Sequence, residues 1–145
     1  MQSLAILVLT STVGISQAVA QSELNAEPNT QCVERLRLPV YPKLAEQARV
    51  SGSLTVIVSL ADGSVKGTTL EMPEASPVAK RLFPPAIDRA LKASVFEKDC
   101  ESKPVRLVFT FVIGEESETN NVPQTVVFGY PNRFWISVPA RHFQP

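Results

Sequence analysis

Hydrophobic and polar residues alternate along two long segments of the chain. Residues 53–60 carry apolar side chains at every second position, and residues 105–113 do so at Val105, Leu107, Phe109, Phe111 and Ile113. This period is typical of strands with one buried face. Asp62-Gly63 follows the first segment and favours a tight turn, because glycine accepts a positive φ angle. We therefore expect residues 53–60 and 65–72 to form a hairpin, and residues 105–113 to form a later strand.

Two other segments show helical spacing. Pro42 suits the first position of a short helix that ends before Gly52. Between Val78 and Ala93, apolar residues recur every three or four positions. Proline inside a helix costs about 3 kcal/mol. We therefore expect the main helix to start at Pro84 or Pro85, with residues 77–83 forming a separate turn or a kinked first segment.

The order of these elements is helix, strand, strand, helix, strand. It predicts an α+β fold in which a small antiparallel three-stranded sheet carries two helices on one face. The motifs, in chain order, are Pro-Val-Tyr-Pro-Lys-Leu-Ala from Pro39, the strand led by Gly52, the Asp62-Gly63 turn, and Lys-Pro-Val-Arg-Leu-Val-Phe-Thr-Phe from Lys103. Together they resemble the C-terminal domain of TonB-family energy transducers. The resemblance spans residues 32–114 and implies a non-catalytic protein-binding module.

In that family, the last strand of the domain offers its edge to a short peptide of an outer-membrane receptor. The resemblance therefore implies recognition by strand addition, in which main-chain hydrogen bonds join an extended peptide to a sheet edge. By position, this peptide-binding edge strand consists of Val105, Arg106, Val108, Thr110 and Val112. The alternative is an edge covered by the protein's own tail or by a second copy in a homodimer, since exposed edges are usually protected.

Two departures from the family pattern change the expected role. Residues 21–31 form only a short polar linker with a single proline, Pro28. Eleven residues in polyproline conformation reach roughly 35 Å, which is too short for a periplasmic spacer, so we do not expect energy transduction by this chain alone. At the corner after the long helix, Ser94 replaces the family's tryptophan and Cys100 lies close by, which indicates that a disulfide anchors this corner instead.

The N-terminus predicts export. Residues 1–20 read as a signal peptide, because an apolar run from Leu4 to Val13 is followed by Ala18-Val19-Ala20 before Gln21. We expect a periplasmic or secreted protein of the cell envelope that does not insert into the membrane after cleavage. The run starts without Lys or Arg, so an uncleaved anchor stays an alternative. In an oxidising compartment, Cys32 and Cys100 are expected to form a disulfide.

The end of the chain has a different composition. Residues 115–121 form a polar spacer, and residues 122–145 form an aromatic-rich C-terminal tail. Tyr130-Pro131-Asn132-Arg133 favours a turn between two arms, residues 125–129 and 134–138. We expect this extra strand or hairpin to dock on the sheet, because so many aromatic side chains are costly to leave in water. The alternative is a patch that faces a partner or a strand donated to a neighbour.

Several function classes receive no support from the sequence. Fourteen acidic and fourteen basic residues cancel, so no basic footprint for nucleic acid is present. We predict no catalytic residues, no cofactor and no metal site: the one histidine, His142, lies near the C-terminus, and with two cysteines it supplies too few ligands. The alternatives to a peptide-binding module are a self-associating structural domain and, as another class, a hydrolase whose site is assembled from distant residues.

Overall fold

The computed structural model describes residues 32–101, 103–116, 123–129 and 132–140. Its elements, in chain order, are β1 (Val33–Arg35), α1 (Lys43–Gln47), β2 (Gly52–Ala61), β3 (Ser64–Glu71), α2 (Pro77–Lys92), β4 (Val95–Phe96), a 3₁₀ turn (Lys98–Cys100), β5 (Val105–Glu116), β6 (Thr125–Gly129) and β7 (Arg133–Ala140). The chain is thus an α+β protein, and the predicted hairpin is present as β2 and β3.

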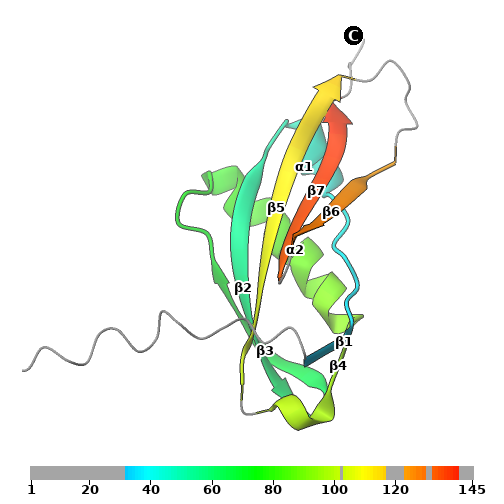
Figure 1. Cartoon of the computed structure of the whole chain (residues 1–145). Helices are drawn as coiled ribbons and strands as arrows, with labels where there is room; N and C mark the ends of the chain where they lie inside the picture. Colours follow the sequence, from blue (N-terminus) through cyan, green and yellow to red (C-terminus); the bar gives the residue numbers. More distant parts are fainter. Residues whose placement is uncertain (1–31, 102, 117–122, 130–131, 141–145) are drawn as a thin grey trace, which may run out of the picture.

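The main sheet has five strands in the order β3-β2-β5-β7-β6 (Figure 1). All neighbours are antiparallel except β5 and β7, which run parallel. The sheet therefore has two more strands than the three predicted, because the tail contributes β6 and β7, and it is mixed and not purely antiparallel. The tail hairpin itself was predicted correctly, and it docks on the sheet as expected.

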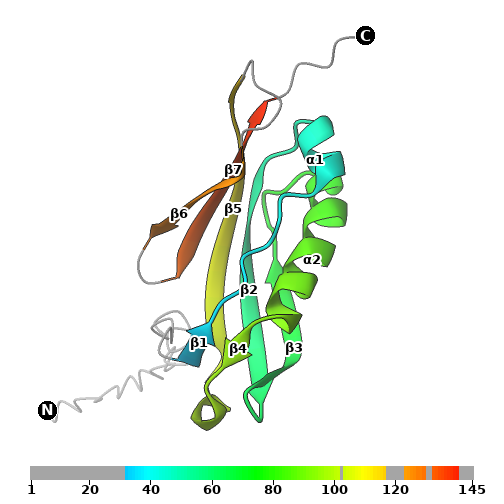
Figure 2. The ribbon, with the colours of Figure 1, turned by 90° about the vertical axis from the view of Figure 1, so that its right-hand side faces the viewer.

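Both helices lie on one face of the sheet (Figure 2), and the core fills the space between the two layers. Phe83 of α2 stacks on Phe111 of β5 with ring centroids 4.3 Å apart. The ring of Tyr41 meets both of them edge-on, at centroid distances of 6.0 and 5.3 Å. Apolar residues at alternate positions of β2, β5 and β7 complete this core, as the two-residue period predicted.

The long helix corrects one prediction. α2 is continuous from Pro77 to Lys92 and contains both Pro84 and Pro85, so the helix does not begin at these prolines. It begins after Ser76, whose hydroxyl accepts the N–H of Ala79 at 3.1 Å. The prolines remove two intrahelical hydrogen bonds. Burial of the apolar stripe on both sides of them, from Ala79 to Leu91, compensates for that loss.

The predicted disulfide is present. Cys32 and Cys100 are bonded, with their Cα atoms 5.6 Å apart. The bridge lies beside a second, two-stranded sheet in which β1 pairs with β4, and the N–H of Glu97 donates to the Cys32 carbonyl at 3.0 Å. The corner after α2 is therefore held by a covalent bond and a short ladder.

Some predictions lie wholly or partly outside the described residues. These are the signal peptide at residues 1–20, the linker at residues 21–31 and most of the spacer at residues 115–121. Residues 122, 130–131 and 141–145 of the tail, with His142 and the first half of the predicted turn, also lie outside them. Among the residues that are described, no helix is both long enough and apolar enough to cross a lipid bilayer.

Candidate functional site

The predicted peptide-binding edge on β5 is not an edge. β5 pairs with β2 on one side and with β7 on the other. Of the predicted site residues, Val105 is buried toward the helices, whereas Arg106, Val108, Thr110 and Val112 lie on the opposite face of the sheet. β5 is covered because β7 pairs along it and extends the buried face of the sheet beyond β5. The paired residues are Phe109 with Phe134, Phe111 with Ile136 and Ile113 with Val138.

The edges of the five-stranded sheet are β3 and β6, and they differ in chemistry. β3 exposes Lys66, Thr68, Thr69 and Glu71, and the register of its pairing with β2 shifts between Ser59 and Leu60. Charged side chains and bulges are the devices that protect sheet edges from unwanted pairing. The sequence of β6, Thr-Val-Val-Phe-Gly, contains neither a charge nor a proline. β6 is therefore the unprotected edge.

The hydrogen bonds of β7 determine which backbone groups of β6 point outward. The N–H of Val108 donates to the carbonyl of Asn132 at 2.9 Å, so even-numbered residues of β7 direct their backbone groups toward β5 and odd-numbered ones toward β6. Trp135 pairs with Val127, and Val127 accordingly points its N–H and C=O toward β7. Val126 and Phe128 point theirs outward, where no described strand pairs with them.

Apolar side chains surround these outward backbone groups. Val127 and Phe128 are each 57% exposed, and Trp135 is 38% exposed. On the helix side, the ring of Phe128 contacts Phe134 at a centroid distance of 5.1 Å. On the open face, the indole of Trp135 lies across Gly129: a Cβ atom at residue 129 would be 2.3 Å from the ring. These three side chains therefore flank the outward backbone groups of β6 on both faces of the sheet.

Two polar side chains hold the hairpin in place. The buried Asn132 donates from Nδ2 to the carbonyl of Arg106 at 2.8 Å. Gln124, just before β6, accepts the N–H of Tyr41 at 2.7 Å and donates to the carbonyl of Pro39 at 3.1 Å. The side-chain amide of Gln124 thus makes the two hydrogen bonds, one accepted and one donated, that the backbone of a paired strand residue would make with the segment before α1. The sequence placed Asn132 in a predicted turn but predicted a partner for neither residue, because a lone Asn or Gln in a polar segment gives no signal of its partner.

The pKa of Tyr41 is raised, chiefly because burial disfavours the phenolate and also because Glu46 lies nearby, while the Ser51 hydroxyl opposes the shift. Arg106 and Glu71 approach to 3.7 Å but are about half exposed, so their ion pair contributes little. The described part of the chain contains no cluster of His, Cys, Asp and Glu that fits a metal ion.

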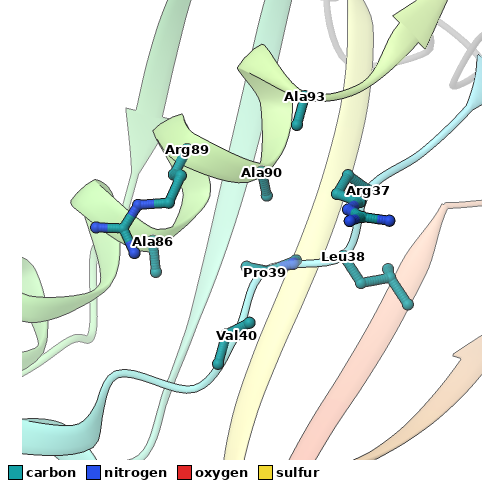
Figure 3. Close-up of a pocket in the computed structure, with 8 residues that line it drawn as sticks. All are labelled: Arg37, Leu38, Pro39, Val40, Ala86, Arg89, Ala90 and Ala93. Atoms are coloured by element: carbon teal, nitrogen blue, oxygen red, sulfur yellow. The ribbon is translucent and has the colours of Figure 1, made fainter.

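A groove of about 270 Å³ runs between α2 and the extended segment before α1 (Figure 3). Its floor consists of the small side chains of Ala86, Ala90 and Ala93, and Arg37 and Arg89 flank it. In Figure 3 the two arginine side chains extend in different directions. They do not converge on one point as an anion site requires.

The chain matches no protein-family model, no curated protein and no solved structure.

Proposed function

We propose that this protein is an exported, non-catalytic binding module that recognises an extended segment of polypeptide by strand addition at the outer edge of β6. The proposal starts from the sequence motifs of residues 32–114, which resemble those of the TonB C-terminal domain. The proposal keeps the recognition chemistry that this resemblance implies but moves it from β5 to β6. A link to transport through an outer-membrane receptor belongs to the same proposal, as does a periplasmic or secreted location.

The observation that carries the proposal is the contrast between the two sheet edges. β3 exposes Lys66 and Glu71, whereas β6 has no charged residue and has exposed apolar side chains at Val127 and Phe128. An added strand would pair with the outward backbone groups of Val126 and Phe128, and its side chains would alternate between the helix side and the open face. This arrangement supports affinity from main-chain bonds and selectivity from the flanking apolar surface.

The disulfide supports the proposed location, because such bonds form and persist in oxidising compartments. It joins residues that lie 68 positions apart and links the residue before β1 to the end of the 3₁₀ turn. Cytoplasmic thiols, by contrast, are kept reduced, so a structural bridge of this kind is rare there.

The test compares wild-type protein with Val126→Pro. Proline removes the outward N–H of residue 126 and leaves the bonds between β6 and β7 intact, because proline is tolerated where the N–H of an edge strand faces solvent. Val126→Thr is the matched control, since it keeps the N–H and the branched shape. Circular dichroism and thermal unfolding establish that both variants fold.

Each protein is used to capture partners from a periplasmic extract. Captured proteins are identified, and synthetic peptides from them are titrated by fluorescence anisotropy. We expect wild type and Val126→Thr to bind the same peptide and Val126→Pro to lose it. Equal binding by folded Val126→Pro would exclude β6 as the contact. Turnover in a broad hydrolase substrate screen would contradict the non-catalytic assignment.

A further inference from the structure

We propose that one occupant of the β6 edge is a second copy of this chain, paired antiparallel through β6 about a two-fold axis at Val127. This inference rests on the proposed function, because it uses the same open edge. It adds the identity of the incoming strand, its direction and its register. The two five-stranded sheets would then form one continuous sheet across the dimer.

The register follows from the outward backbone groups. Val126 and Phe128 each present one N–H and one C=O beyond β6. In an antiparallel pair, hydrogen-bonded residues exchange both bonds, and they alternate with pairs that exchange none. If Val126 faces Phe128 of the second copy, the two-fold axis places Phe128 opposite the second copy's Val126. All the outward groups of these two residues are then satisfied in both copies. An axis at Val126 or at Phe128 would place one of these two residues opposite a residue outside Thr125–Gly129, so the axis at Val127 gives the longest overlap of the two β6 strands.

The side chains also fit a symmetric contact. A two-fold interface must be self-complementary, so any charged residue near its axis faces its own like charge. β6 has no charged residue and therefore has no such conflict. Val127 would meet the second copy's Val127 in a pair that exchanges no hydrogen bonds, with Cα atoms about 4.5 Å apart. On the other face, Phe128 would pack against the second copy's Val126, next to its own contact with Phe134.

The experiment introduces a charge at the axis. Val127→Lys and Val127→Glu each place two like charges opposite one another across the axis. Because Val127 is 57% exposed on the open face, both variants should fold, and circular dichroism checks that they do. Thr69→Lys is the matched control, since it places the same charge on an exposed position of the other edge strand, β3.

Molar mass is measured by sedimentation equilibrium over a wide concentration range. We expect the mass of wild type and of Thr69→Lys to rise toward twice the monomer mass. Each Val127 variant alone should stay monomeric, and an equimolar mixture of the two should dimerise again, since Lys then faces Glu. A monomeric wild type at the highest concentration, or a mixture that stays monomeric, would overturn the inference.

The same samples separate this inference from the proposed function. If wild type is monomeric but binds a captured peptide in a manner that Val126→Pro abolishes, the second-copy inference fails and strand addition to a foreign segment stands. If wild type dimerises and folded Val126→Pro dimerises equally, the contact lies elsewhere. In that case the second-copy inference fails whatever the peptide titration shows.

Discussion

Removal of the disulfide between Cys32 and Cys100 should destabilise the fold strongly. We consider the double variant Cys32→Ala/Cys100→Ala. The bridge joins two residues that lie 68 positions apart in the sequence. For a closed loop of this length, the chain-entropy relation gives a stabilisation of about 4 kcal/mol at 25 °C. For a domain of this size, that loss lowers the midpoint of thermal unfolding by roughly 10 to 20 °C. The beginning of the fold, where β1 pairs with β4, loses its covalent link to the 3₁₀ turn.

The assay is urea unfolding followed by the fluorescence of Trp135, the single tryptophan of the chain, with circular dichroism as a second probe. Either single variant, Cys32→Ala or Cys100→Ala, should cost about as much as the double variant, because each one already breaks the bridge. The denaturant slope should increase, since the uncrosslinked unfolded chain exposes more surface. A loss below about 1 kcal/mol would refute the reasoning that the bridge acts mainly by constraining the unfolded chain.

Three further predictions concern individual side-chain contacts. Gly129→Val should destabilise by about 1–3 kcal/mol, because its Cβ atom would meet the indole of Trp135; a red-shifted tryptophan emission measures the displacement, and an unchanged spectrum would contradict it. Phe83→Ala should cost about 3–5 kcal/mol in urea unfolding, because Phe83 is buried and stacks on Phe111; a cost near zero would mean that this stack is not formed. Tyr41 donates from its hydroxyl to the Val50 carbonyl at 2.6 Å, and burial raises its pKa. The unfolded chain therefore releases this proton first as pH rises through about 10, so wild-type stability should fall from there up to the folded pKa. Tyr41→Phe should lose about 1 kcal/mol at neutral pH and decline less steeply above pH 10, as pH-dependent urea unfolding would show; an equally steep decline would refute the assignment.

The hairpin of β2 and β3 and the strand β5 were predictable, because local rules decide them. Alternation gives the buried face, and Asp62-Gly63 gives the turn. The predicted start of α2 was too late, because the prediction counted only the local free-energy cost of Pro84 and Pro85. It did not include the favourable burial of the apolar stripe of the helix, to which Phe83 belongs. Tertiary packing can outweigh the local helix propensity of a segment, and a single sequence does not show that packing.

The position of the open edge could not be predicted from the sequence, because it depends on where the tail inserts. The two arms of the tail hairpin were identified, but their order in the sheet was not. β7 takes the inner place beside β5 because its alternation, from Phe134 to Val138, continues a buried face. β6 has a weaker alternation and lies outermost. The candidate site therefore moved from β5 to β6.

The central claim is that the outer edge of β6 is open and accepts a strand. Amide hydrogen exchange at Val126, Val127 and Phe128, followed by NMR, tests it most directly. In the dilute protein, the amide of Val127 should exchange slowly because it bonds to β7, while those of Val126 and Phe128 exchange fast. Once a captured peptide or a second copy saturates the edge, Val126 and Phe128 should become protected as well. Slow exchange of all three amides in the dilute protein, or no gain of protection at saturation, would contradict the account.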